Sequence, residues 1–223
     1  MKNLSLIIPA KYEKESLPRV LTELKKYKYP TYIVLEKNDT ETIKSIKKFN
    51  VNIIYQKSKG YGSALTQGIN TVKTKYFIIF NADGSFNPKE IKKILVKATS
   101  ENYDMVFASR YHDKKSGSED DTIVTYLGNK IFTFIGKIFF FLPISDILYT
   151  FVLCNTKKTR NLKLKSFDFR FCVELPIKAI KKNYKIPAIS SYERSRIAGK
   201  KKVSAIKDGF LILTAMVELF FSL

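Results

Sequence analysis

The first 110 residues alternate short apolar runs with segments of helical periodicity, and this alternation limits the fold more than any other feature of the chain. The apolar runs are LSLII (4–8), TYIVLE (31–36), VNIIY (51–55), KYFIIF (75–80) and YDMVFAS (103–109). Between them, apolar residues recur three or four positions apart, as in Leu17, Val20, Leu21 and Leu24. Strands that alternate with helices are typical of a parallel sheet covered on both faces. The sequence therefore predicts an α/β fold with a mostly parallel sheet.

Simple counts exclude several classes of protein. Hydrophobic residues make up 45% of the 223 positions and include 17 Phe, which supplies a sizeable core and excludes a disordered chain. The two cysteines, Cys154 and Cys172, form no CxxC pair, and His112 is the single histidine. A disulfide scaffold and a Cys/His zinc site are therefore excluded, and a reducing compartment is expected.

Charged residues interrupt the apolar stretches. Lys11 and Glu13 break the opening run, so no secretory leader is expected. Asp146, Asp208 and Glu218 divide the apolar C-terminal part of the chain into pieces that we expect to be shorter than the roughly 18 residues needed to cross a membrane. The sequence therefore predicts neither a secreted nor a membrane-spanning protein.

A strong positive charge narrows the choice of partners. The chain has 40 Lys and Arg against 20 Asp and Glu, which gives a formal net charge of +20. Nucleic acid, an anionic membrane surface and phosphorylated small molecules all fit this charge. However, the lysines are dispersed, the aromatic residues lie within apolar runs, and no RNP, helix-turn-helix or zinc pattern occurs. No nucleic-acid partner is therefore expected.

Polar residues and glycines follow each predicted strand. The segments are 9–13 (PAKYE), 36–39 (EKND), 57–62 (KSKGYG), 81–84 (NADG) and 109–111 (SRY). Ligands of open parallel sheets bind beyond the carboxyl ends of the strands, so we expect a ligand site there. Asp83 stands between the small residues Ala82 and Gly84 and could bind Mg²⁺ together with substrate phosphates. An aspartate at a strand end can equally form a turn or cap a helix.

Common nucleotide-binding and hydrolase motifs do not explain the polar segments that follow the predicted strands. Gly60 and Gly62 open a predicted helix, but a GxGxxG fingerprint would need a glycine where the chain has Leu65. No GxxxxGK[ST] or GxSxG string occurs, and His112 lies in a polar segment. A Rossmann dinucleotide site, a P-loop and a histidine-based triad are therefore not expected.

Beyond residue 111 the chain changes character. We expect a polar, mobile loop over 112–121 and two apolar-rich helices over about 121–141 and 203–221. Each helix carries a narrow polar stripe, which in the first helix consists of Thr122, Thr125, Asn129, Thr133 and Lys137. Helices this apolar either pack in a core or an oligomer, or insert into a membrane interface beside basic residues. The sequence leaves both alternatives open.

Five segments, in the same order along the chain, resemble motifs of GT-A-fold family 2 glycosyltransferases. They are LIIPAKYEKESL, KGYGSALTQGI, FNADGSFNPKEI, FASRY and YERSRIAGKKKV. The family strings are IIPAYNEE, GKGAALRTGI, DADLQHPPE, GSRY and R-x-x-G-x-S-K, the last of the dolichol-phosphate-mannose-synthase-like branch. The resemblance covers about residues 4–210. It implies one Rossmann-like GT-A domain over 1–223, with a nucleotide-sugar-binding half (1–111) and an acceptor- and membrane-facing half (112–223).

The resemblance also implies roles for single residues. The nucleotide-sugar pocket would be lined by Pro9, Ala10, Glu13, Glu36, Lys59, Asn81, Ala82 and Asp83, while Gly60 and Gly62 would let the backbone approach the nucleotide sugar. Asp83 and Asn81 would bind a divalent cation, Mg²⁺ or Mn²⁺. The phosphates would be clamped by Arg110, Arg196 and Lys202, and the planar fork of arginine suits phosphate oxygens.

Three departures from the family pattern occur at these positions. The first carboxylate of the D-x-D pattern is Asn81 here, and the glutamine two places after Asp83 is Ser85, so metal affinity should be weaker or depend more on the donor diphosphate. The family's DDGS reads EKND at 36–39, and the serine expected before the loop lysine is Lys201. An active enzyme is still expected, because the metal carboxylate and both arginines remain.

The implied reaction is inverting transfer of a sugar from a nucleotide-diphosphate sugar. A polyprenyl phosphate is the preferred acceptor, because the two apolar helices offer a membrane dock beside the basic loop 194–202, and a sugar hydroxyl in glycan assembly is the alternative. A phosphate is already largely ionised and needs no general base, whereas a hydroxyl needs one. Asp120 and Asp121 are candidates for that base, or else they cap the following helix. Asp146 resembles an aspartate of the polyprenyl-phosphate branch or is structural.

This reading also predicts where the protein works. We expect it in the cytoplasm, peripheral at the cytoplasmic face of the membrane, because the apolar helices and the surplus of lysines both favour an anionic lipid surface. A membrane partner or a second copy of the chain in a homo-oligomer would cover the same apolar surfaces.

Overall fold

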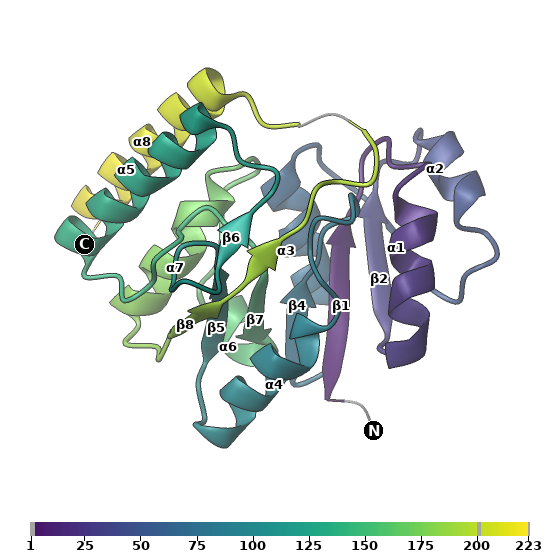
Figure 1. Cartoon of the computed structure of the whole chain (residues 1–223), viewed down its shortest axis with the longest axis horizontal. Coiled ribbons are helices and arrows are strands. Elements are labelled where there is room, and N and C mark those ends of the chain that lie inside the picture. Colours follow the sequence, from purple (N-terminus) through teal and green to yellow (C-terminus); the bar gives the residue numbers. More distant parts are fainter. Residues whose placement is uncertain (1–2, 200–201, 223) are drawn as a thin grey trace.

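A computed structural model of the chain describes residues 3–199 and 202–222 (Figure 1). Its centre is a seven-stranded sheet in the order β3-β2-β1-β4-β7-β5-β8. The strands are β1 (Leu4–Pro9), β2 (Thr31–Leu35), β3 (Asn52–Tyr55), β4 (Tyr76–Ile79), β5 (Met105–Ser109), β7 (Val152–Asn155) and β8 (Ala188–Ser190). Neighbouring strands pair in parallel, except that β7 is antiparallel to both β4 and β5. All five predicted strands are present, and the predicted α/β fold class is confirmed.

Helices cover both faces of the sheet. On one face lie α1 (Leu17–Leu24) and α4 (Glu90–Ser100), and on the other lie α3 (Tyr61–Thr71) and α7 (Phe171–Lys181). The shorter helices are α2 (Thr40–Ser45), α6 (Thr156–Asn161) and the 3-10 turn η1 (Lys25–Tyr27). A second, two-stranded sheet pairs β6 (Gly117–Ser118) with β9 (Tyr192–Glu193).

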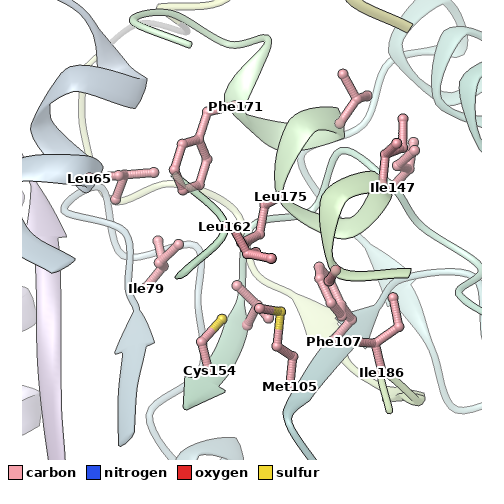
Figure 2. Packing of buried hydrophobic residues seen from close by; sticks show 14 of the residues in the cluster. Leu65, Ile79, Met105, Phe107, Ile147, Cys154, Leu162, Phe171, Leu175 and Ile186 are labelled. Carbon is pink, nitrogen blue, oxygen red and sulfur yellow. The ribbon is translucent and has the colours of Figure 1, made fainter. Parts of the chain in front are cut away.

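Alternate residues of each strand enter two apolar clusters, one on each face of the sheet. In β1, Leu6 and Ile8 pack with α1 and α4, whereas Ile7 packs with α3 and α7. Figure 2 shows the cluster that contains Ile7, in which Leu65 of α3 and Phe171 of α7 lie over the strands. Both faces are thus filled with apolar side chains, and the polar chemistry is left to the ends of the strands.

No strand was predicted beyond residue 109, where the structure has β6, β8, β9 and the antiparallel strand β7. β7 is only four residues long, its first three residues are fully buried, and no helix of clear periodicity leads into it. Its insertion between β4 and β5 separates the end of β4, which carries Asp83, from the end of β5, which carries Arg110.

The segment 112–121, predicted to be a mobile loop, is attached to the basic segment that follows β9. Gly117 and Ser118 form β6, and Glu119 accepts hydrogen bonds from the backbone and hydroxyl of Ser195 at 2.9 and 3.2 Å. These contacts hold two predicted functional segments side by side.

The two predicted apolar helices are confirmed as α5 (Ile123–Phe140) and α8 (Ala205–Phe221), which lie side by side at one edge of the molecule (Figure 1). The middle of the polar stripe of α5, Asn129 and Thr133, is buried and faces inward. The outer faces expose large apolar side chains: Ile123, Val124, Leu127, Ile131, Phe134, Ile138, Phe139, Ile206, Phe210, Leu213, Val217, Phe220 and Phe221. The amphipathic pattern of α5 is therefore inverted relative to that of an ordinary surface helix, whereas the buried residues of α8 are the apolar Ile212, Ala215 and Met216.

By length and composition, α5 is also able to cross a membrane: it has 18 residues, of which 22% are buried. The expectation that the apolar pieces are too short for a span is wrong for α5, because the stretch between Asp121 and Asp146 contains no acidic residue. Core helices meet the same criterion, so this property alone does not assign α5 to a membrane.

Candidate functional site

A cavity of about 920 Å³ opens at the carboxyl ends of the strands, where the sequence analysis expected a ligand site. Its walls come from the ends of four strands: Pro9, the last residue of β1, with Ala10, then Glu36 after β2, Asn81, Ala82 and Asp83 after β4, and Arg110 after β5. The cavity extends between α5 and α8, where Phe132 and Ile212 line it. One cavity therefore joins a charged end to an apolar end.

Most of the predicted site residues line this cavity. They are Pro9, Ala10, Glu13, Glu36, Gly60, Asn81, Ala82, Asp83, Arg110, Asp120, Asp121, Arg196 and Lys202. Lys59 is exposed and lies outside the lining, and Gly62 is buried behind it. Segments separated by up to about 190 positions of sequence thus meet at one place, as in the contact between Glu13 and Lys202.

The glycines Gly60 and Gly62 have a packing role that was not predicted. A Cβ atom at Gly60 would lie 2.1 Å from the carbonyl oxygen of Phe167, and one at Gly62 would lie 2.2 Å from that of Ser166. Gly60 also has a φ of +114°, which disfavours other residues. Their missing side chains admit the backbone of residues 166–168, which closes one wall of the cavity, so close approach to a nucleotide sugar is not needed to explain them.

Asp83 lies in the cavity with its carboxylate turned toward its own loop and the basic segment. Its Oδ1 accepts a hydrogen bond from the backbone of Ser85 at 3.0 Å, and its Oδ2 lies 3.8 Å from Arg196. The Nδ2 of Asn81 donates to the Ser85 hydroxyl at 3.3 Å. Asp83 therefore forms the turn that was considered as the alternative to metal binding, and the one role does not exclude the other.

These oxygen groups fit a hard divalent cation only in part. Within residues 3–199 and 202–222, no cluster of three or more His, Cys, Asp or Glu side chains could enclose a metal ion. One carboxylate, with the carboxamide of Asn81 beside it, is the minimum that Mg²⁺ uses when substrate oxygens and water complete its coordination. The residues present fit a metal that is bound mainly through a ligand.

The basic segment after β9 lies across the cavity mouth and is paired with acidic side chains. Arg196 makes two hydrogen bonds to Asp120, at 2.7 and 3.2 Å, and Lys202 contacts Glu13 at 3.0 Å. The hydrogen bonds that Arg196 donates to Asp120 raise the pKa of its guanidinium, so this side chain is a permanent cation. Of the predicted basic loop 194–202, Lys200 and Lys201 lie outside the described residues.

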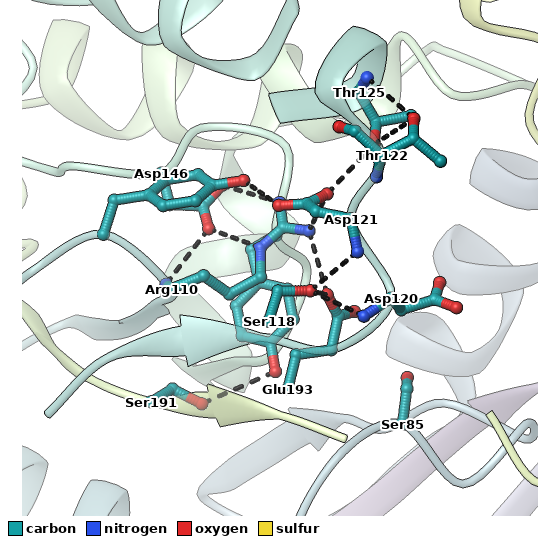
Figure 3. A network of polar contacts seen from close by, with 12 residues as sticks. Ser85, Arg110, Ser118, Asp120, Asp121, Thr122, Thr125, Asp146, Ser191 and Glu193 are labelled. Carbon is teal, nitrogen blue, oxygen red and sulfur yellow. Dashed lines mark hydrogen bonds and ion pairs between the residues drawn. The ribbon is translucent and has the colours of Figure 1, made fainter. Parts of the chain in front are cut away.

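Arg110 is engaged by three carboxylates (Figure 3). Asp146, which is fully buried, binds it through both oxygens at 2.7 and 3.0 Å, Glu193 binds it at 3.0 Å, and Asp121 at 3.4 Å. Burial alone would lower the pKa of Arg110, but the charges of Asp146 and Glu193 raise it well above the ordinary value. In this geometry carboxylates occupy four of its five side-chain N–H donors, and its phosphate-clamping role stays a prediction. Asp146 has the structural role that was left open.

Asp121 belongs to the same network and does not cap α5. Thr122 is the N-cap residue of that helix, since its hydroxyl accepts from the backbone of Thr125. Asp121 accepts hydrogen bonds from the hydroxyls of Tyr111 and Thr125 as well as from Arg110. Burial and the bond to Asp121 raise the pKa of Tyr111, so this phenol stays a hydrogen-bond donor. A carboxylate is thus held in the cavity wall, as a general base would be.

Several cavity residues were missed in the sequence. Tyr12, 63% exposed with a φ of +55°, stands at the mouth and donates its backbone N–H to Asp39 at 2.7 Å. Lys11 pairs with Glu36 at 3.1 Å. Both lie in the string PAKYE, whose position after a strand was the available signal. Tyr61 had the same signal, because it lies in KSKGYG after the third predicted strand, whereas Leu148, Phe169 and Cys172 had none, because only the tertiary fold brings them to the cavity.

Comparison with known proteins places the chain in a family. Residues 5–162, more than two thirds of the chain, match the family described as Glycosyl transferase family 2. An uncharacterized protein of Methanocaldococcus jannaschii is 30% identical over 135 residues, which are 58% of this chain and 55% of that protein. An uncharacterized glycosyltransferase of Mycobacterium tuberculosis is 24% identical over 210 residues, 93% of each chain. The chain spans about half the length of two archaeal relatives, 55% and 50%.

Solved structures show the same fold at low sequence identity. Glucosyl-3-phosphoglycerate synthase from Mycobacterium tuberculosis, in complex with uridine diphosphate, has a TM-score of 0.77 and 10% identity over 98% of this chain and 80% of that one. The same synthase with Mn²⁺, uridine diphosphate and phosphoglyceric acid has a TM-score of 0.74 and 12% identity over 99% and 79%. This similarity confirms the predicted GT-A architecture. With the family match over residues 5–162, it means that the chain belongs to glycosyltransferase family 2.

Proposed function

We propose that this chain transfers a sugar from a nucleotide-diphosphate sugar to a lipid phosphate at a membrane surface. The observation that carries the proposal is the cavity itself, which runs from Glu13, Glu36 and Asp83 at the strand ends to Phe132 and Ile212 between α5 and α8. A substrate with a charged head and an apolar tail matches a cavity that is polar at one end and apolar at the other. The dolichol-phosphate-mannose-synthase-like branch remains part of this proposal.

The donor occupies the strand ends. Glu13, Glu36 and Tyr12 surround the mouth near β1 and β2, and Asp83 lies deeper, after β4. Support comes from the similar synthase, whose solved complexes contain uridine diphosphate and Mn²⁺. A divalent cation held by Asp83 and Asn81 would neutralise the diphosphate charge and act as a Lewis acid.

The chain's own cations serve the leaving group. As the bond to the sugar breaks, the diphosphate gains negative charge, and cations placed against it stabilise the transition state more than the ground state. Arg196 and Lys202 lie at the cavity mouth, where they are paired with Asp120 and Glu13. A bound diphosphate would compete with these carboxylates for the two cations, so the basic segment exchanges one set of anions for the other as the donor binds.

A phosphate acceptor simplifies the remaining chemistry. A phosphate monoester has a second pKa near 6, so it is already a nucleophile at neutral pH and needs no general base. The similar synthase was solved with phosphoglyceric acid, which supports a phosphate-bearing acceptor but, because that molecule also has a hydroxyl, does not distinguish which group attacks the sugar. What a lipid adds is the hydrocarbon chain, for which the apolar end of the cavity offers room.

The outer face of α5 and α8 suits a membrane surface, and we propose that the protein binds the cytoplasmic face of a membrane peripherally. Ile206 and Phe210 are 87% and 67% exposed on α8, and Phe134 is 65% exposed on α5. Lys130 and Lys137 are exposed on the same helix and would meet anionic headgroups. A second copy of the chain, or a membrane partner, would cover the same face and is the alternative outcome.

A sugar hydroxyl is the second candidate acceptor, and one observation favours it. Asp121 lies in the cavity wall, where Arg110, Tyr111 and Thr125 orient its carboxylate. A general base is what a hydroxyl acceptor requires, and loss of one typically costs about a hundredfold or more in rate.

A donor screen with an Asp121→Asn variant tests the proposal. UDP-, GDP- and other nucleotide sugars are incubated with a polyprenyl phosphate, with and without Mn²⁺ or Mg²⁺, and the released nucleoside diphosphate is measured. We expect metal-dependent release that increases with the lipid and that Asp121→Asn changes little. Release that responds to glycan acceptors only, and that Asp121→Asn reduces a hundredfold, would replace the lipid phosphate by a hydroxyl acceptor.

A further inference from the structure

Two glycines in the interior of α5 and α8 line the apolar end of the cavity. They are Gly128 and Gly209. A glycine inside a helix is about 1 kcal/mol less favourable than alanine, so each position calls for a physical reason. A Cβ atom built at Gly128 meets no described atom within 4 Å, and one built at Gly209 meets only the tip of the Phe132 ring, at 3.9 Å.

The usual reason for a helix glycine is close packing, and Gly136 of α5 illustrates it. A Cβ atom there would lie 2.9 Å from Leu142 and 3.1 Å from Ile147, so a larger residue would clash. No such neighbour exists at Gly128 or Gly209 among the described residues. The space that these two glycines leave open belongs to the cavity.

Asn129, the neighbour of Gly128, is a second and independent observation at this place. It is 3% exposed and lines the cavity, and its Oδ1 has no hydrogen-bond partner within the described part of the chain. Thr125 and Thr133, one turn away on either side, are both satisfied, by Asp121 and by the backbone of Ile147. An unpaired buried polar group costs about 1 to 3 kcal/mol, so it indicates a position where a ligand group completes the hydrogen bonding.

Gly128 and Gly209 lie at the same end of the helix pair, so the open space beside them lies between the N-terminal halves of α5 and α8. Phe220 contacts Phe139 and Phe140, with ring centroids 5.8 and 6.1 Å apart, so α5 and α8 are joined at their C-terminal ends. Gly128 and Gly209 lie in the N-terminal halves of the two helices. The cavity lining there includes Val124 and Ile206, which are also 63% and 87% exposed, so the apolar end of the cavity reaches the outer apolar face.

We infer that the gap between the N-terminal halves of α5 and α8, bordered by Gly128 and Gly209, holds the hydrocarbon chain of the acceptor, with Asn129 at the junction between chain and polar head. This inference rests on the proposed function, since it assumes a lipid phosphate as acceptor. The chain of a lipid anchored in the membrane passes through the gap and its phosphate reaches the donor. A carboxamide serves this junction because it offers both a donor and an acceptor without adding charge.

Filling the gap tests the inference. Gly128→Leu and Gly209→Leu are compared with the corresponding alanine variants and with Val96→Leu, an exposed position on α4 outside the cavity. Transfer is measured to a long polyprenyl phosphate and to dimethylallyl phosphate, which carries one isoprene unit. Both leucine variants should stay folded, with melting temperatures at or above that of the wild type, because the sites are open and helix propensity improves.

The ratio between the two acceptors is the decisive readout. We expect the leucine variants to lose about tenfold or more in kcat/KM for the long chain, with little change for the short one, and the alanine variants to fall in between. Asn129→Leu should raise the melting temperature but raise KM for both phosphates, which a purely structural residue would not do. An unchanged ratio in both leucine variants, or an equal loss for both acceptors, would overturn the inference and leave the proposed function standing. Transfer by the wild type to glycans and to neither phosphate would refute both.

Discussion

Replacing apolar side chains on the outer face of α5 and α8 should release the protein from membranes. Burying a large apolar side chain contributes about 1.5 to 3 kcal/mol. Ile206 and Phe134 are 87% and 65% exposed. Scaled by these fractions, each should contribute about 1 to 2 kcal/mol when it inserts. The double variant Ile206→Ser, Phe134→Ser should therefore lose about 3 kcal/mol, or roughly a hundredfold in the partition coefficient.

Co-sedimentation with liposomes measures this loss. The wild type should pellet with anionic vesicles more than with neutral ones, and added salt should weaken binding by screening the lysines. The control is Val96→Ser, which removes a side chain of similar exposure, 52%, from α4 on another part of the surface. Equal pelleting of the double variant and the wild type would refute the membrane reading. A dimer of the wild type that dissociates in the double variant would assign the face to self-association instead.

Further predictions concern the site and its supports. Asp83→Ala should abolish metal-dependent turnover at saturating donor while the circular dichroism spectrum is unchanged. Asn81→Asp should tighten Mn²⁺ binding in a direct titration, and an unchanged titration would contradict the assignment of Asn81 and Asp83 as the metal ligands. Asp146→Ala leaves the buried Arg110 guanidinium without the two bonds that it donates to Asp146, so urea denaturation should show a loss of about 3 kcal/mol or more, and a loss under 1 kcal/mol would count against this role. Glu174 is buried, which raises the pKa of its carboxyl, but bonds from a lysine and two backbone N–H groups lower it more strongly, to below its usual 4.5. Glu174→Gln should thus cost about 1 to 2 kcal/mol at pH 7, and because the folded-state pKa is the lower one, the difference from the wild type should fade as the pH drops below about 4.5; a constant difference down to pH 3 would refute the ionic role.

The sequence predicted the sheet because its strands repeat one local pattern. LSLII, KYFIIF and the other runs are short and apolar and are flanked by helical periodicity, so the order of elements up to residue 109 followed from local chemistry. β7 lacks that context, and its antiparallel insertion between β4 and β5 depends on long-range packing that no local pattern encodes. The same limit explains why Leu148 and Cys172 were not assigned to the cavity.

The sequence predicted which residues line the candidate site better than it predicted which groups those residues contact. Most of the residues predicted at strand ends, Pro9 and Asp83 among them, line the cavity because strand-end position fixes where a side chain lies, whereas Arg196 and Lys202 were identified through the family resemblance. Partner choice depends on groups far away in the sequence. Arg110 was expected to face phosphate, but it binds Asp146, 36 positions later. Likewise, Gly60 was expected to face a ligand, but it accommodates the backbone of Phe167.

The inward direction of the polar stripe of α5 could not be obtained from periodicity alone. A stripe of threonines and one asparagine on an apolar helix has two opposite interpretations, because the spacing is the same whether water or protein lies on the polar side. The structure buries Asn129 and Thr133 and exposes Ile131 and Phe134. One helix therefore presents polar side chains to the interior of the protein and apolar side chains to its outer surface.

Direct detection of the product tests the central claim, which is sugar transfer to a lipid phosphate. The wild-type protein is incubated with a nucleotide sugar labelled in the sugar, Mn²⁺, and anionic vesicles that contain a polyprenyl phosphate. The label is then followed by partition between water and organic solvent. Our account predicts that the label moves into the organic phase with the wild type and with Asp121→Asn, and stays in water with Asp83→Ala. Label that remains in water with the wild type under every donor, or that reaches only the hydroxyls of added glycans, would contradict it.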